Sequence, residues 1–190
     1  LIETMSDSYE AKAAVLAAKE NCDLPVLVTL IFDEKGKLLT GGTVDSTVSM
    51  LEGLRVDALG VNCGLGPKQM HPIIERLTQV SSLPIIVNPN AGLPRSENGK
   101  TVFDIAPAEF SDLMEEIAGM GVQALGGCCG TTPEHLRLTI EKCRKVPFRP
   151  PVAKRRTVVS SFSQAVEIGP KPVIIGERIN PTGKSKFKAA

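Results

Sequence analysis

The chain has 190 residues, of which 42% are hydrophobic and 23% are charged, and its formal net charge is +1. This composition is typical of a globular chain, and we expect a cytoplasmic protein. Basic residues are not gathered into a stripe interleaved with aromatics, which argues against nucleic acid as a partner. No apolar run approaches the roughly 20 residues that a membrane-spanning helix needs.

Short β-rich runs alternate with helical periods, which indicates βα units and a parallel sheet. In chain order we expect a strand at 1–3, a helix at 9–20, a strand at 26–32, a helix at 43–54, a strand at 58–61, a helix at 68–80, a strand at 84–88, a helix at 107–120, a strand at 124–127 and a helix at 133–145. The last helix begins with Thr132 as a cap and Pro133 at its first position. Five such units fit part of a closed barrel or an open doubly wound sheet.

Polar residues at the ends of the expected strands favour the barrel. Glu3, Cys63, Asn88 and the pair Cys128 and Cys129 all follow strands, at the face on which (β/α) barrels build their sites. An open sheet concentrates its site at one switch point, whereas these residues come from four different strands. Neither a dinucleotide fingerprint nor a phosphate-binding loop is present.

Three cysteines carry the strongest chemical signal. Cys63, Cys128 and Cys129 each end a short apolar run and open into glycine, so their thiols can meet at one rim of the sheet. Three thiolates leave one corner of a zinc tetrahedron open, as in catalytic zinc sites. The alternatives are burial as small hydrophobes and a vicinal disulfide. Cys22 and Cys143 are assigned to packing or surface.

Several motifs resemble the zinc-dependent homocysteine S-methyltransferase family. They are residues 62–67 (NCGLGP), 88–92 (NPNAG) and 126–133 (GGCCGTTP). Farther on, residues 175–183 (IGERINPTG) resemble the start of the pterin-binding domain that follows in the cobalamin-dependent methionine synthases. The order of the motifs narrows the resemblance to that group.

This resemblance implies a fold and a division of the chain. The α/β fold would be part of a (β/α)8 TIM barrel, about strands four to eight. Residues 1–147 would form the carboxyl-terminal part of the zinc domain, 148–171 a linker, and 172–190 the start of the pterin-binding domain with the first strand of a second barrel. Both chain ends suggest a fragment of a longer protein. A half barrel exposes two sheet edges, so we expect a homo-oligomer of the fragment.

The resemblance also implies cofactors and a reaction. Zinc held by Cys63, Cys128 and Cys129 would take the sulfur of homocysteine as its fourth ligand and keep it as a thiolate. The thiolate would then accept a methyl group from methylcobalamin, giving methionine. The cobalamin-binding domain of the same full-length protein would be the partner, and methyltetrahydrofolate the further methyl source. We expect little or no turnover from this chain alone.

Three further residues are candidates by the same resemblance. Glu3 matches the family's carboxylate for the homocysteine amino group, although a surface charge is an equally good interpretation. Asn90 lines the substrate mouth or serves only as a turn residue. Asn180 would contact folate in the complete protein. His71 and His135 lack metal-ligand spacing and are assigned to surface or capping roles.

Two alternative functions remain open. One is a stand-alone methyltransferase that uses betaine or S-methylmethionine as donor, which residues 175–183 disfavour. The other is a structural zinc clamp in an interaction module, which a fourth protein ligand would favour.

Overall fold

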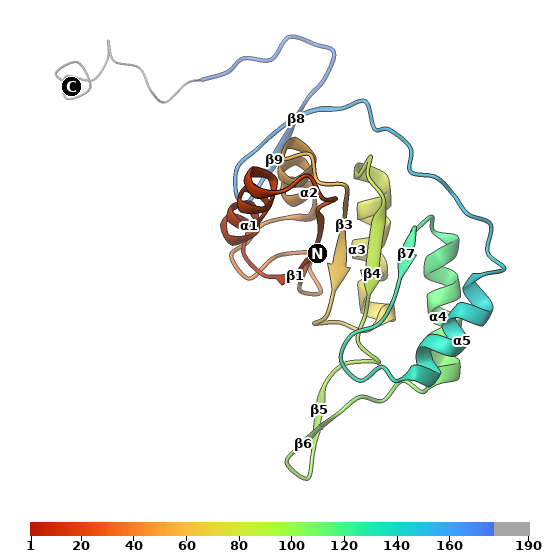
Figure 1. Cartoon of the computed structure of the whole chain (residues 1–190). Coiled ribbons are helices and arrows are strands. Elements are labelled where there is room, and N and C mark those ends of the chain that lie inside the picture. Colours follow the sequence, from red (N-terminus) through yellow and green to blue (C-terminus); the bar gives the residue numbers. More distant parts are fainter. Residues whose placement is uncertain (177–190) are drawn as a thin grey trace.

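The computed structural model describes residues 1–176 and is built on a parallel sheet of five strands (Figure 1). The strand order is β1-β2-β3-β4-β7, with β1 at Ile2–Met5, β2 at Leu27–Leu30, β3 at Ala58–Asn62, β4 at Ile85–Asn88 and β7 at Ala124–Leu125. The helices are α1 at Ser8–Asn21, α2 at Val44–Gly53, α3 at Pro67–Val80, α4 at Pro107–Gly119 and α5 at Pro133–Cys143. The expected α/β class and parallel sheet are confirmed, with small shifts at the ends of elements.

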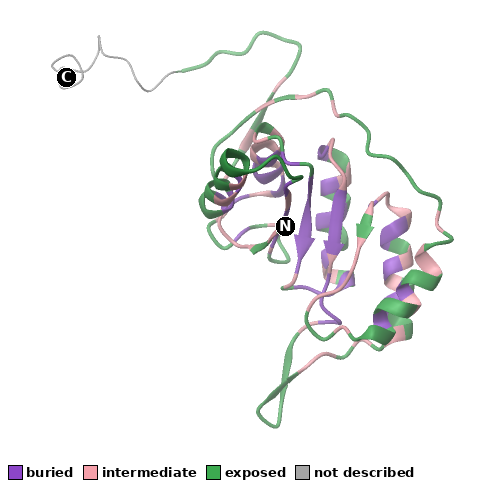
Figure 2. Cartoon of the chain, in the orientation of Figure 1, coloured by how far each residue is buried: buried purple, intermediate pink, exposed green. Residues whose placement is uncertain are grey.

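The core lies between one face of this sheet and the helices. Alternate strand residues supply its sheet side, namely Val28, Leu30, Leu59, Val61, Ile85 and Val87. Helices α1 to α4 supply the other side through Val15, Leu51, Ile74, Phe110 and Met114. This pattern follows from side chains that point alternately to opposite faces of a strand. In Figure 2 the central strands and the inward sides of the helices are accordingly buried.

The opposite face of the sheet allows no side chain at position 60. A Cβ atom added to Gly60 in β3 would lie 1.8 Å from the carbonyl oxygen of Ile86 in β4. Only glycine permits such close approach of two backbones. Thr29 of β2, which points to the same face, is also fully buried.

A two-stranded hairpin, which the sequence did not lead us to expect, leaves the sheet after β4. It consists of β5 at Arg95–Glu97 and β6 at Lys100–Val102, paired antiparallel. The side chains of β5 are exposed, and Figure 1 shows the hairpin projecting beyond the carboxyl ends of the strands.

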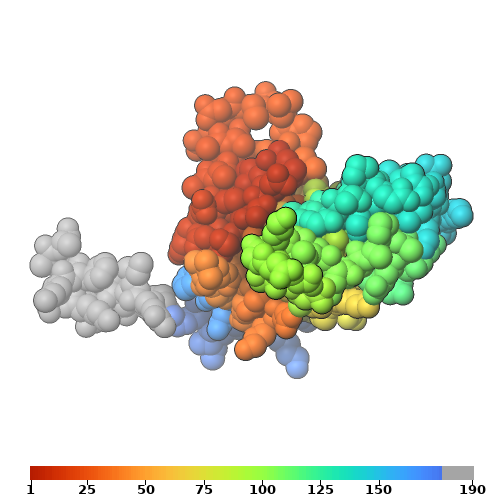
Figure 3. All heavy atoms as spheres, turned by 90° about the horizontal axis from the view of Figure 1, so that it is seen from below, coloured from red at the N-terminus to blue at the C-terminus, as the bar shows by residue number. Residues whose placement is uncertain are grey.

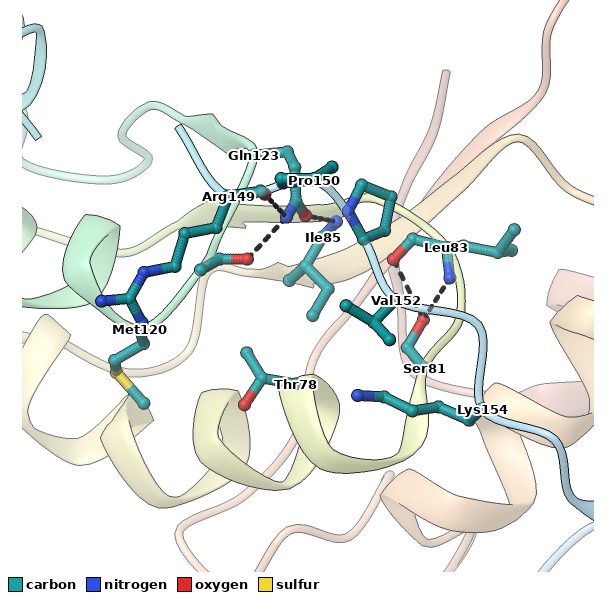
Figure 4. Close-up of a pocket in the computed structure, with 12 residues that line it drawn as sticks. Thr78, Ser81, Leu83, Ile85, Met120, Gln123, Arg149, Pro150, Val152 and Lys154 are labelled. Atoms are coloured by element: carbon teal, nitrogen blue, oxygen red, sulfur yellow. Dashed lines mark hydrogen bonds between the residues drawn. The ribbon is translucent and has the colours of Figure 1, made fainter. Parts of the chain in front are cut away.

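Residues 149–154, here called the strap, cross the amino ends of β4 and β7. Gln123 Nε2 donates to the carbonyl oxygen of Arg149 at 2.8 Å, and the Lys154 N–H donates to Ser82 Oγ at 2.8 Å. Gln123 Oε1 accepts from the Ile85 N–H at 2.7 Å, so one amide joins strap and sheet. A cavity of about 150 Å³ lies beneath the strap (Figure 4). It lies at the end of the sheet opposite to that at which the cysteines gather.

A second hairpin follows the strap and packs on α1 and α2. Its strands are β8 at Thr157–Ser160 and β9 at Ala165–Ile168. Arg156 lies 3.8 Å from Asp45 of α2, and Phe162 stacks on Tyr9 of α1 with ring centroids 6.0 Å apart. Arg76 of α3 holds the pKa of Asp45 below its ordinary value through a direct hydrogen bond. The segment expected to be a linker therefore contains a docked hairpin.

The described chain ends in a stretch without helix or strand at residues 172–176. Asn180 and most of the expected pterin-binding segment lie outside the described residues. Among helices of residues 1–176, none has both the length and the apolar character needed to cross a bilayer.

Candidate metal centre

The sulfurs of Cys63, Cys128 and Cys129 gather at the carboxyl ends of β3 and β7. All three Sγ atoms lie within 4.8 Å of one another, and those of Cys63 and Cys129 are 3.8 Å apart. Figure 3 views the molecule from this end, with the β5–β6 hairpin in front. The structure thus brings together three residues that are 66 positions apart at most. Among residues 1–176 this is the one group of three or more metal-ligating side chains.

Cys63 reaches the cluster through an unusual backbone conformation. Its φ angle is +59°, in the left-handed region that a non-glycine residue seldom occupies. The Cys63 N–H donates to the Asn88 carbonyl at 3.1 Å, and the Leu65 N–H returns to the Cys63 carbonyl at 2.8 Å. Left-handed backbone of this kind costs roughly 1–3 kcal/mol and gathers at functional sites. The turn directs Cys63 away from the strand path and toward the vicinal pair.

The loop that carries Cys128 and Cys129 is fastened to the residues after β4. The Cys128 N–H donates to the Pro89 carbonyl at 2.8 Å, and the Ala91 N–H donates to the Cys129 carbonyl at 2.9 Å. Gly130 then turns the chain with φ +81°, and a Cβ there would lie 2.4 Å from Phe103. Backbone contacts and a required glycine therefore hold both cysteines on the same side.

Electrostatics oppose three negative sulfurs in the absence of a cation. Burial, together with the adjacent Cys63, raises the pKa of the Cys128 thiol to about 11. Near neutral pH Cys128 is therefore protonated in the metal-free chain. Because a metal ion requires the thiolate, its binding must displace this proton.

The spacing of the sulfurs fits a tetrahedral metal. With zinc–sulfur bonds of about 2.3 Å, two ligand sulfurs lie about 3.8 Å apart, which is the separation of Cys63 and Cys129. The widest pair must close by no more than about an ångström from 4.8 Å. Cys129 is exposed, so solvent or a ligand can reach the fourth corner. Soft thiolate donors in this number are those that zinc prefers.

Glu3 lies in a β-bulge of the edge strand β1. Ile2 pairs with Val28 and Met5 with Leu30, so β1 holds one residue more than β2 between these pairs. Bulges are frequent beside active sites, where they redirect a side chain. Glu3 is exposed and takes part in none of the ion pairs among residues 1–176.

Asn90 is buried, with 3% of its surface exposed. Its Oδ1 accepts a hydrogen bond from the Cys129 N–H at 3.0 Å. Its own N–H donates to the Leu65 carbonyl at 3.0 Å. Asn90, which was expected to line the substrate mouth or serve in a turn, contacts the Cys129 loop through its side chain and the Cys63 loop through its backbone N–H.

Sequence reasoning gave no role in the site to two other residues near it. His135 caps α5, where Nδ1 lies 2.9 Å from Thr132 Oγ1 and Nε2 lies 2.9 Å from the Ile105 carbonyl. Asn62, the last residue of β3, contacts both Thr4 and Cys128. The available signal for Asn62 was a polar residue at the end of a buried strand, directly before a cysteine of the cluster.

Comparisons with known proteins identify the family of the chain. Residues 1–143 match the family model described as homocysteine S-methyltransferase. The whole chain is 32% identical to methionine synthase of Mycobacterium leprae and 31% identical to that of Mycobacterium tuberculosis. It spans 17% of the length of each of these relatives.

Solved structures resemble the chain in fold. The homocysteine methyltransferase MmuM from Escherichia coli in its apo form matches with a TM-score of 0.60 and 21% identity, over 74% of this chain and 47% of that one. Its metallated form matches with a TM-score of 0.58 and 23% identity, over 76% and 45%. The family model, which matches residues 1–143 of the 190, shows that the chain belongs to the homocysteine S-methyltransferase family.

Proposed function

We propose that this chain binds zinc through Cys63, Cys128 and Cys129 and activates the thiol of homocysteine as a methyl acceptor. The observation that carries the proposal is the cluster of three sulfurs within 4.8 Å, with Cys129 exposed to solvent. Three protein ligands and an open fourth position are typical of catalytic zinc, whereas structural sites are closed by four. A purely structural clamp is therefore disfavoured.

The chemistry follows from what a free thiol lacks near neutral pH. An unperturbed thiol has a pKa of about 8.5, so only a small fraction is the nucleophilic thiolate. Zinc bound at the cluster would supply a Lewis acid that holds the substrate sulfur as thiolate. The three cysteine thiolates would hold the metal ion, and their negative charge would keep the acceptor sulfur electron-rich.

Glu3 is proposed to receive the amino group of homocysteine. Its carboxylate is exposed on the bulge of β1. An ammonium ion would form a charge-assisted hydrogen bond with it, which is stronger than a neutral one. Asn90, which holds Cys129, is proposed to act on the substrate only through the position of that cysteine.

The methyl donor and the rest of the fold are proposed from the longer relatives. Because the chain spans 17% of the methionine synthases, methylcobalamin and methyltetrahydrofolate would bind to other parts of such a protein. The match to these relatives extends over the whole chain. It therefore favours this donor over betaine or S-methylmethionine. Residues 1–147 would belong to the zinc domain, and the pterin-binding domain would begin near Pro172.

We also propose that the five strands are part of a (β/α)8 barrel. Both β1 and β7 are edge strands of the described sheet, and free edges pair readily with other strands. In a longer protein the remaining strands of the barrel would cover them. In the chain alone a second copy would do so.

Zinc titration of the 190-residue chain tests the proposal. We expect one zinc per chain, measured by competition with a chelating dye, and tight calorimetric binding of L-homocysteine only after zinc is added. Cys128→Ser should abolish tight zinc binding, whereas Cys143→Ser, which lies outside the cluster, should retain it. Wild-type affinity in Cys128→Ser, or binding of homocysteine without zinc, would refute the proposed site.

A further inference from the structure

We propose that Asn62 is a positioning residue that locks the bulge carrying Glu3 and orients Cys128 toward the other two sulfurs. The inference rests on the proposed function for its zinc readout. Asn62 ends β3, with 1% of its surface exposed. It lies between the two parts of the site, the edge strand β1 on one side and the cysteine loop after β7 on the other.

The bulge requires an external hold because its backbone is strained. Thr4, the residue after Glu3, has a φ angle of +65°. A β-branched residue in this region is a genuine outlier, and such strain persists only where the surroundings impose it. Relaxation of Thr4 would change the direction of the adjacent Glu3 side chain.

Asn62 supplies that hold with two hydrogen bonds to one residue. Its Oδ1 accepts from the Thr4 N–H at 2.9 Å, and its Nδ2 donates to Thr4 Oγ1 at 2.8 Å. The backbone N–H can only donate, so the oxygen of the amide must face it. This assignment turns the amide nitrogen toward the hydroxyl and toward the cysteines.

The nitrogen of the same amide also lies near a sulfur. Asn62 Nδ2 lies 4.0 Å from Cys128 Sγ, a long contact from the only side-chain amide that faces this sulfur among the described residues. Partners of this kind orient metal ligands and tune their basicity. Asn62 would therefore favour the rotamer of Cys128 that metal binding needs.

One amide group thus connects the proposed substrate carboxylate to the cysteine cluster. The donors and the acceptor of the Asn62 side chain contact Thr4 and Cys128. Two separable losses follow from its removal. Thr4 loses the two hydrogen bonds that keep its backbone in the left-handed conformation. Cys128 loses its only side-chain amide donor among the described residues.

Two variants of the full chain separate these losses. Asn62→Leu has a similar shape but makes neither contact, so hydrogen exchange at the Thr4 amide should accelerate by at least about tenfold and zinc affinity should fall about 10- to 100-fold. Asn62→Leu/Thr4→Gly removes the steric need for a hold, since glycine adopts positive φ freely. This double variant should form the bulge again, but its affinity for zinc should stay below that of the wild-type chain. Asn21→Leu, the same substitution on the exposed end of α1, is the control and should match the wild-type chain.

The outcomes distinguish the inference from the proposed function. If the wild-type chain binds no zinc, the proposed function is refuted. Hydrogen exchange at the Thr4 amide of the metal-free chain would still test whether Asn62 holds the Thr4 backbone. Zinc binding that is unchanged in Asn62→Leu, or fully restored in the double variant, would overturn the role toward Cys128. Should Asn62→Leu not fold, the wild-type chain decides: its Asn62 side-chain amide protons should be protected from exchange and should shift when zinc is added. Unprotected or unshifted protons would overturn the inference.

Discussion

The backbone N–H of Cys129 donates to the side-chain oxygen of Asn90 at 3.0 Å. The N–H of Asn90 in turn donates to the Leu65 carbonyl at 3.0 Å. One buried residue therefore ties the loop of Cys63 to the loop of Cys129. We therefore expect Asn90 to help to set the distance between these two sulfurs.

Asn90→Ala should destabilise the chain and weaken its metal site. The Cys129 N–H would lose its acceptor in a part-buried hydrogen bond, which costs about 0.5–1.5 kcal/mol. Urea unfolding should show a loss of this size, and zinc affinity should fall about 10- to 100-fold. Asn90→Asp retains an acceptor oxygen and should lose less of both. An equal loss in the two variants would show that the hydrogen bond to Cys129 is not the cause.

The stability of the metal-free chain should fall in alkaline solution because of Cys128. The fold raises the pKa of this thiol from 9.0 to about 11. Below pH 9.0 the thiol is protonated in both states, so the full stability is present. Between that pH and about 11 the unfolded chain loses the proton more readily, and the free energy of unfolding decreases. Urea unfolding across this range should show a smaller decrease in Cys128→Ser, and parallel curves for the two chains would contradict the assignment.

Gln123→Ala should release the strap from the sheet. The substitution leaves the Ile85 N–H and the Arg149 carbonyl without the Gln123 amide. An unsatisfied buried group costs about 1–3 kcal/mol, so we expect a loss of that order in urea unfolding. Limited proteolysis should also cut residues 149–154 faster. Gln79→Ala on α3 is the control, and the same rate of cleavage in both variants would refute the role of Gln123.

Gly60→Ala should prevent the sheet from forming in its present geometry. The added methyl would lie 1.8 Å from the Ile86 carbonyl oxygen, so the strands would have to separate. We expect a loss above about 3 kcal/mol, as for severe overpacking. Gly53→Ala at the end of α2 meets no atom within 4 Å and should be neutral or slightly stabilising. Circular dichroism during thermal unfolding measures both. A Gly60→Ala chain as stable as Gly53→Ala would contradict the close approach of β3 and β4.

Periodicity was sufficient to predict the helices and the strands of the parallel sheet. Apolar residues on one face of each helix, and proline at the start of the last one, mark elements that local preference and burial both favour. The cysteines were predicted to meet because the carboxyl ends of parallel strands share one edge. Their convergence follows from topology and needs no knowledge of side-chain positions.

The two hairpins and the polar contacts of the site could not be predicted in this way. Residues 95–102 form a short, polar hairpin, and residues 157–168 form two strands of four residues each, so that the strand conformation of both segments depends on pairing. In the sequence, Asn62 and Asn90 cannot be distinguished from asparagines that serve only in turns. Their partners, Thr4 and Cys129, are 58 and 39 positions away, and only the folded chain shows them. The left-handed backbone conformations of Thr4 and Cys63 could not be predicted for the same reason.

The central claim is that three cysteines form a metal site with an open fourth position for homocysteine. Zinc X-ray absorption on the purified chain, with and without L-homocysteine, tests it most directly. We predict three sulfur neighbours and one lighter atom before the addition, and four sulfur neighbours after it. Four protein ligands that do not change with homocysteine, or no bound zinc, would contradict the account.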